Sequence, residues 1–342
     1  MKLAAPPILP KSLKSRFSLW NILFFLLGLA ILVFLLLKID FHSLVQLIGK
    51  IHWQYLALGA VAYLCKGTLR SFRFYRLNRR SQPSYVRMLR LTFASSLASQ
   101  ILPLKLGELS YVYLLKRDHE APISQGLSTL LVVRLFDLLA ISILFIAIAF
   151  IAQVPAGLSV YFYSILAFIG ALVLLLIALL VLANFAQPVL NFFFGHAWVQ
   201  KIPLADKLRR MTENIFTDLK QYRPMEYGEM VATACAEWLV NYATFQVMLI
   251  GMGLTPSFFA TVVAVTFAAL ASVLPINSFG NFGTQEAGWA TGLVLLGFTQ
   301  SLALTSGFGT HLLTLGYMLV FGGLSWLSYL FTHKQAAPQS EL

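Results

Sequence analysis

The chain has 342 residues, of which 58% are hydrophobic and 11% are charged. Soluble domains usually carry about a quarter charged residues, so the composition excludes two ordinary soluble domains and indicates a membrane protein. The formal net charge at pH 7 is +12. Because the basic residues punctuate apolar stretches of bilayer length, they predict loops beside anionic lipid headgroups rather than a surface that binds nucleic acid.

Six apolar stretches are long enough to cross the roughly 30 Å hydrocarbon core as helices. They cover about residues 20–37, 53–70, 125–152, 158–184, 228–251 and 302–331. The first stretch lacks the small-residue cleavage site of a signal peptide, so we expect it to be retained. Six crossings place both termini on one side of the membrane. Residues 70–90 hold seven arginines and no acid, which makes that side cytoplasmic by the positive-inside rule.

Two further apolar stretches, residues 85–117 and 257–297, are interrupted near their middles by proline and glycine, which break helices. Each stretch predicts a re-entrant helical hairpin, although four short crossings would also keep the termini inside. A basic stretch at 201–223 has apolar residues at helical spacing and predicts a cytoplasmic interfacial helix.

The two hairpins share a sequence, TFASSLASQILP at residues 92–103 and TFAALASVLP at 266–275. Each half of the chain reads span, span, hairpin, span, and the halves have opposite orientations. We therefore predict one all-α polytopic membrane domain, residues 1–342, built as an inverted-topology repeat of residues 18–152 and 158–331. Such repeats occur in secondary transporters, where broken helices meet near the bilayer midplane. The alternative is a duplicated unit that serves packing alone.

Polar residues in and beside the hairpins are the candidate substrate-binding residues, because a charge inside a span is costly unless it is paired or hydrated. These candidates are Lys105, Glu108, Arg134, Asp137, Asn277, Asn281, Gln285 and Glu286. The expected hairpin breaks are Pro103, Gly107, Pro275, Gly280 and Gly283. Irregular backbone at membrane depth is tolerated where it lines a cavity, so we expect a cavity there. Arg134 and Asp137, three residues apart on one helical face, could instead form a structural ion pair.

Other ionisable residues favour structural roles. The arginine run is interpreted as a topology signal, Lys66 is expected to extend toward the cytoplasm, and His311 is expected to be a core histidine. Glu237 and Asn241 share a helical face. No P-loop, GxSxG or HExxH motif occurs, and the chain offers no cysteine or histidine cluster, so we expect no metal and no cofactor. A hydrolytic enzyme is disfavoured, whereas an intramembrane transferase stays open.

Three motifs carry a family resemblance. They are LPLKLGELSYVYLLKR at 102–117, VVRLFDLL at 132–139 and LPINSFGNFGTQEAG at 274–288. Together they resemble the lysylphosphatidylglycerol synthase transmembrane region family, also called the flippase-like domain family. That family has an LPxRxGE-type motif, an R-x-x-D pair and an LPxxGGxGxxE-type motif. Here Lys105 replaces the commoner Arg, Tyr111 stands where many members have a further Arg, and the last motif lacks adjacent glycines.

The resemblance implies movement of lipids or lipid-linked headgroups between leaflets. We predict a lipid or lipid-linked-sugar translocase in the cytoplasmic (inner) membrane, with the headgroup phosphate bound in a midplane cavity between the hairpins. The expected partners are an anionic phospholipid or a polyprenyl-phosphate-linked lipid, with a homo-oligomer or an envelope-biosynthesis protein left open. The alternative is an intramembrane enzyme, or a membrane subunit of a glycolipid or cell-envelope lipid assembly system. The aminoacyl-transferring domain is absent from these residues, so aminoacylation is not expected.

Overall fold

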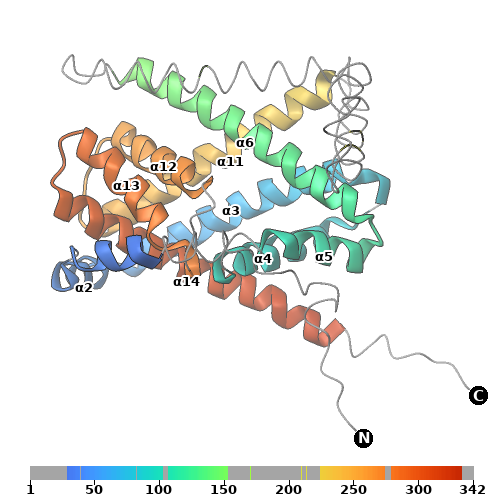
Figure 1. Cartoon of the computed structure of the whole chain (residues 1–342), viewed down its shortest axis with the longest axis horizontal. Coiled ribbons are helices and arrows are strands. Elements are labelled where there is room, and N and C mark those ends of the chain that lie inside the picture. Colours follow the sequence, from blue (N-terminus) through green and yellow to red (C-terminus); the bar gives the residue numbers. More distant parts are fainter. Residues whose placement is uncertain are drawn as a thin grey trace, which may run out of the picture.

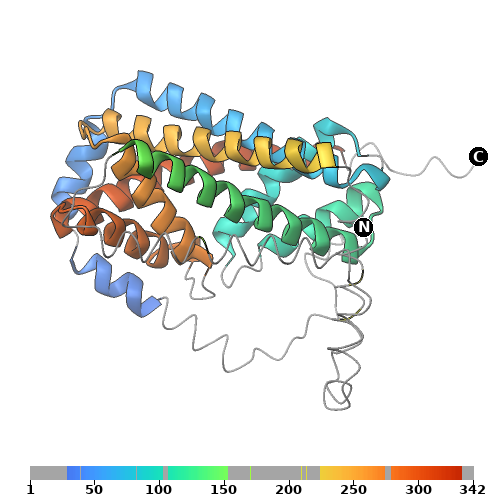
Figure 2. The same ribbon diagram turned by 90° about the horizontal axis from the view of Figure 1, so that it is seen from above.

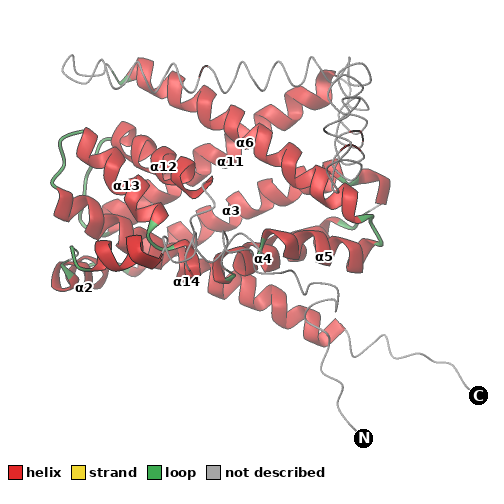
Figure 3. Cartoon of the chain, viewed as in Figure 1, coloured by secondary structure: helices red, strands yellow, loops and turns green. Residues whose placement is uncertain are grey.

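The computed structural model of the chain describes nine parts of the sequence. They are residues 29–38, 40–81, 83–102, 107–152, 224–273 and 279–332, and the single residues 170, 209 and 213. Six of these residues are described in their backbone alone, namely Arg80, Pro224, Val273, Phe279, Leu330 and Thr332. All regular structure in these parts is helical (Figure 3), which confirms the all-α prediction for them. The predicted span 158–184, most of the interfacial helix 201–223 and the start of the first span lie outside the described residues.

Four long helices form the body of the molecule (Figure 1). They are α3 (Trp53–Leu77), α6 (Ile123–Ile151), α11 (Pro224–Gly251) and α14 (Gln300–Thr332). Two pairs of shorter helices pack beside them. These pairs are α4 (Tyr85–Ile101) with α5 (Glu108–His119), and α12 (Phe258–Val273) with α13 (Thr284–Leu295). The smaller elements are the helical segment Leu29–Leu36, α2 (Phe41–Gly49) and the 3₁₀ helices η1 (Arg79–Ser81) and η4 (Phe279–Asn281).

Two described helices are long and apolar enough to cross a membrane, α6 and the Gln300–Tyr329 part of α14. A third crossing results if the bent pair Leu29–Leu36 and Phe41–Gly49 is one span. The described residues therefore establish a helical membrane protein without reaching the predicted six spans. Helices α3 and α11 fall short because polar side chains interrupt their apolar sequences. These two helices pack along one another (Figure 2), so many of those polar side chains lie between helices rather than against lipid.

Each interrupted stretch forms two helices that turn back on one another. The α4–α5 pair and the α12–α13 pair lie toward opposite ends of the long helices (Figure 1), and Gln100 near the end of α4 contacts Gly280 of η4. Glycine permits the close approach within each pair. A Cβ on Gly107 would lie 2.1 Å from Ser99 Cα, and a Cβ on Gly288 would lie 2.5 Å from the Phe267 carbonyl oxygen. The distance between the two helices of each pair therefore depends on a glycine, which has no Cβ atom at the contact.

Each pair of short helices belongs to an apolar core of its own. The α12–α13 pair packs with α11 and α14 around buried residues such as Phe245, Trp289 and Phe308. The α4–α5 pair packs with α3 and α6 around residues such as Leu91 and Leu114. Apolar packing therefore fixes the position of both turns, and polar residues carried by the same helices are placed with them.

Candidate functional site

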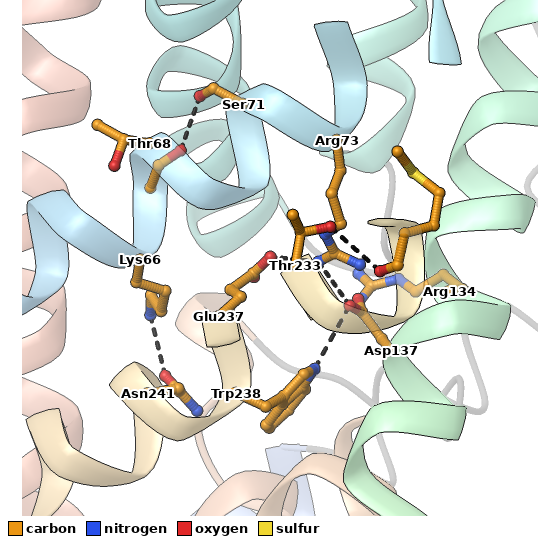
Figure 4. A network of polar contacts seen from close by, with 12 residues as sticks. Lys66, Thr68, Ser71, Arg73, Arg134, Asp137, Thr233, Glu237, Trp238 and Asn241 are labelled. Atoms are coloured by element: carbon orange, nitrogen blue, oxygen red, sulfur yellow. Dashed lines mark hydrogen bonds and ion pairs between the residues drawn. The ribbon is translucent and has the colours of Figure 1, made fainter. Parts of the chain in front are cut away.

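Arg73 is the centre of a polar cluster at the meeting point of α3, α6 and α11 (Figure 4). Its side chain is 1% exposed. The Nη2 atom donates to Asp137 Oδ1 at 2.7 Å and also to Glu237 Oε2. One guanidinium thus contacts carboxylates on two other helices, α6 and α11. Its Nε–H and Nη1–H groups make no hydrogen bond to the described residues.

The expected pairing of Arg134 with Asp137 is only a secondary contact. Arg134 Nη2 donates to Glu108 Oε1 at 2.7 Å, whereas its Nη1 lies 3.9 Å from Asp137 Oδ2. Asp137 is already engaged, because Oδ1 accepts from Arg73 and, at 3.4 Å, from Trp238 Nε1. The Arg134 side chain is 45% exposed and that of Glu108 25% exposed. This pair therefore connects the buried cluster to an accessible edge beside the break at Gly107.

Lys66 faces inward, toward α11 and the Tyr63 ring, which corrects the expectation that it extends away from the helices. Its Nζ donates to Asn241 Oδ1 at 3.1 Å and lies 4.8 Å from the centroid of the Tyr63 ring. Six ionisable side chains form this cluster, three basic and three acidic, namely Lys66, Arg73, Arg134, Glu108, Asp137 and Glu237. Arg70, one turn before Arg73 on α3, adds a further positive charge near Asp137 and Lys66. An incoming anion that binds Arg134 must compete with Glu108, the present partner of that guanidinium.

A second polar cluster joins the turns of the two helix pairs through Gln100, one turn before the first break. Its Nε2 donates to the carbonyl oxygen of Gly280 at 2.6 Å, and its Oε1 accepts from Asn281 Nδ2 at 3.0 Å. The same Nε2 lies 2.5 Å from His311 Nε2 in α14. One amide side chain thus connects α4, η4 and α14.

Glu286 and His311 form the buried end of this second cluster. Their side chains are 0% and 1% exposed, and His311 Nδ1 is paired with Glu286 Oε1. Glu286 Oε2 accepts from the backbone N–H of Gly283 at 2.7 Å. The turn reaches this geometry through positive φ angles of 68° at Gly280, 56° at Asn281 and 96° at Gly283. Glu286 lies in the first turn of α13, where backbone N–H groups and the helix dipole favour a negative charge.

The predicted site residues therefore fall into two groups. Glu108, Arg134 and Asp137 belong to the first cluster, whereas Asn281 and Glu286 belong to the second, and Gln285 is half-buried on α13. Four predicted residues lie outside the described part of the chain, namely Pro103, Lys105, Pro275 and Asn277. No group of three or more potential metal ligands occurs among the described side chains.

Five ionisable or amide side chains in these clusters were not among the predicted site residues, namely Lys66, Arg73, Gln100, Glu237 and His311. Arg73 has a sequence signal. It follows Lys66 by seven residues on one helical face, and the acid-bearing face of Glu237 and Asn241 requires an opposing cation. The interpretation of the whole arginine run as a surface signal is wrong for Arg73, because α3 continues to Leu77 and turns this side chain inward.

The long apolar helices and the charges paired between them define a helical membrane protein. The sequence profile of the lysylphosphatidylglycerol synthase TM region matches residues 21–323, and the chain belongs to this family. The resemblance carried by the three motifs is confirmed. No curated protein and no solved structure matches the chain significantly. Family membership associates the chain with membrane lipids.

Proposed function

We propose that the chain moves a phosphate-bearing lipid or lipid-linked sugar between the leaflets of the cytoplasmic membrane. The observation that carries this proposal is the 45% exposed side chain of Arg134. At 1.5 Å per residue, Arg134 lies about 16 Å along α6 from Ile123, which is near the middle of a core about 30 Å thick. An exposed guanidinium is costly against lipid tails at that depth, so the position suits a site that water and an anionic headgroup enter.

In the proposed binding step, the headgroup phosphate replaces Glu108 as the partner of Arg134. A guanidinium can grip phosphate through two parallel hydrogen bonds, and Lys105 adds a point charge from the same break. Asp137 keeps Arg134 in place while Arg73 holds Asp137. On the other side of the cavity, the proposal places the polar residues of the second turn, namely Asn277, Asn281, Gln285 and Glu286.

The proposed topology has six spans, cytoplasmic termini and two re-entrant hairpins that enter from opposite sides. Residues 18–152 and 158–331 are the inverted halves, and residues 201–223 lie at the cytoplasmic surface. Support comes from the placement of the α4–α5 and α12–α13 pairs at opposite ends of the long helices, with contacts between their turns (Figure 1). Such an arrangement is typical of transporters whose substrate site lies at the interface of inverted repeats.

The test is a leaflet-resolved assay of purified protein in sealed vesicles. A headgroup-labelled anionic phospholipid and a polyprenyl-phosphate-linked sugar are supplied in parallel. We expect one lipid to move, and Arg134→Ala and Lys105→Ala to abolish that movement. Arg79→Ala is the matched control, because Arg79 pairs with Glu226 at 2.8 Å and its side chain is 45% exposed, like that of Arg134.

Folded protein that moves neither lipid would contradict the translocase proposal. Mass spectrometry of the recovered lipids separates the alternative. A chemically altered lipid would favour an intramembrane enzyme, or the membrane subunit of a lipid assembly system, over a translocase.

A further inference from the structure

The cluster of Gln100, His311 and Glu286 allows one consistent placement of its protons. The carbonyl oxygen of Gly280 can only accept, so the Gln100 atom that lies 2.6 Å from it must be the amide nitrogen. This fixes the orientation of the amide, which hydrogen-bond partners generally decide. The same nitrogen lies 2.5 Å from His311 Nε2 and donates to it. His311 therefore accepts at Nε2, which means that the imidazole is neutral and carries its proton on Nδ1.

The proton on Nδ1 determines the state of Glu286. Nδ1–H points at Glu286 Oε1, so that oxygen accepts, and Oε2 accepts from the Gly283 N–H at 2.7 Å. Both oxygens accept, so the carboxyl group is ionised. Its position in the first turn of α13 favours that charge. The structure thus holds a carboxylate, a neutral imidazole and an amide in one chain of hydrogen bonds.

Among the side chains that contact His311 in the described residues, namely Glu286, Gln100 and Phe282, the titratable one is Glu286 of α13. Helix α4 presents the amide of Gln100, and the Phe282 ring after η4 stacks on the imidazole at 4.3 Å between centroids. The neighbouring turns of α14 face apolar or thioether side chains. These are Leu44 and Met252 beside Gly309, and Met248 beside Thr314. A proton taken up in this cluster is therefore shared by Glu286 and His311 alone.

A proton added to His311 must occupy Nε2, the atom toward which Gln100 already donates. Two donors then face each other across 2.5 Å, so the Gln100 side chain must move away, and its bonds to Gly280 and Asn281 are lost together with the contact to His311. Rotating the Gln100 amide does not restore it, because Oε1 would then face the Gly280 carbonyl oxygen and the nitrogen would face the Asn281 amide nitrogen, 3.0 Å from the present Oε1. The protonated imidazole still pairs with Glu286, and the buried pair becomes neutral. Proton uptake therefore strengthens the contact between His311 and Glu286 and breaks the contact between His311 and Gln100.

We propose that His311 is a proton-binding site whose occupation releases the first hairpin from the second. In the neutral state, Gln100 ties α4 to η4 and α14. In the protonated state, the α4 end is free to move away from the turn of the α12–α13 pair. The role of this site in transport rests on the proposed function. In a translocase, the proton would control access to the cavity.

The experiment measures the separation of the two hairpins directly. Spin labels are placed at Leu109 of α5 and Thr291 of α13, both exposed, in a background of Cys65→Ser and Cys235→Ala. Double electron–electron resonance is recorded on the full chain in lipid nanodiscs at pH 8 and pH 5.5. We expect one short distance at pH 8 and a shift of several ångströms to a longer, broader distribution at pH 5.5.

Three variants make the result specific to His311. In His311→Gln, the amide oxygen can accept from Gln100 and the amide nitrogen can donate to Glu286, so the short distance should persist at both pH values. Gln100→Leu removes the tie and should give the long distance at both. His42→Gln, which changes an exposed histidine of α2, should keep the wild-type response. A melting temperature for each protein shows that it is folded.

The proposal is overturned if the wild-type distance is the same at both pH values, or if His311→Gln retains the full pH response. It is also overturned if folded Gln100→Leu keeps the short distance at pH 5.5 and pH 8. The nanodiscs are made of a zwitterionic phospholipid alone, so neither the anionic phospholipid nor the polyprenyl-phosphate-linked sugar is present in this measurement. A distance that does not respond to pH therefore contradicts the proton site and not the translocase proposal. An absence of lipid movement contradicts the translocase proposal and not the proton site.

Discussion

Arg73 in α3 donates a 2.7 Å hydrogen bond to Asp137 in α6, and both side chains are buried. The same nitrogen contacts Glu237 in α11, so one cation compensates two carboxylates. Removing one partner from a buried ion pair is strongly destabilising, because the remaining charge has neither water nor a counter-ion. The stability of the three-helix junction should therefore depend on this side chain more than on any single surface pair.

We expect Arg73→Ala to lower the free energy of unfolding by about 3–5 kcal/mol, the usual cost of breaking a buried pair. Arg79→Ala removes a half-exposed pair with Glu226 and should cost at most about 1 kcal/mol. Denaturant titration of the purified proteins in one detergent measures both. The triple change Arg73→Met, Asp137→Asn and Glu237→Gln should regain most of the loss, since none of the three residues that form these ion pairs then carries a charge. Equal stability of Arg73→Ala and Arg79→Ala would contradict the role of Arg73 as a counter-ion.

Gly107 should not tolerate a side chain. A Cβ there would meet backbone atoms of α4, with Ser99 Cα at 2.1 Å and the Ala98 carbonyl oxygen at 2.2 Å. Backbone atoms cannot swing aside, so Gly107→Ala must separate α4 from α5, and we expect a loss of about 1–3 kcal/mol or more. Gly316→Ala is the matched control. Nothing lies within 4 Å of its Cβ position in the interior of α14, so stability should rise by up to about 1 kcal/mol. Melting temperatures of both variants that move in the same direction would contradict this prediction.

The interrupted helices could be predicted from the sequence because proline and glycine act locally. Residues 85–117 and 257–297 contain the α4–α5 and α12–α13 pairs that the structure describes. Their re-entrant path through the membrane stays a prediction. The contact between the two turns could not be predicted, since Gln100 and Gly280 are 180 residues apart in sequence and an amide can serve many partners.

The identity of the central cation depended on tertiary packing. Arg70, Arg73 and Arg76 recur every three residues along α3, so all three lie near one face and look equivalent in sequence. Packing against α11 and α6 separates them. Arg73 meets Asp137 and Glu237 inside, whereas Arg76 pairs with Glu229 nearer the surface, where its side chain is 24% exposed. Spacing alone could not predict that difference.

Changes to Glu108 and Arg134 should shift the affinity for an anionic headgroup in opposite directions. Glu108→Gln frees the guanidinium and gives the six-residue cluster a net positive charge, so binding of a labelled anionic phospholipid should tighten. Arg134→Gln removes the donor and should weaken it. We expect the dissociation constant of the labelled phospholipid to fall about tenfold in Glu108→Gln and to rise about tenfold in Arg134→Gln. A tenfold change corresponds to roughly 1.4 kcal/mol of binding free energy. Fluorescence titration in detergent measures both, and both variants should unfold within about 1 kcal/mol of the parent, because exposed ion pairs contribute little. Shifts of the same sign would show that the pair acts as a unit rather than as a gate for the anion.

His119, which ends α5 outside the predicted spans, should make the fold sensitive to acid. Burial lowers the pKa of its imidazole below the usual 6.5, and Arg87 and Arg90 lower it further, while Asp118 opposes them. Its Nε2 is buried without a hydrogen-bond partner among the described residues. Between pH 6.5 and the lowered pKa of His119, the imidazole is protonated in the unfolded chain and neutral in the folded chain. The free energy of unfolding therefore falls as the pH drops through this range. The melting temperature should fall less between pH 7.5 and pH 5.5 in His119→Gln than in the parent. If both fall equally, the imidazole is protonated in the folded protein and burial does not exclude the proton.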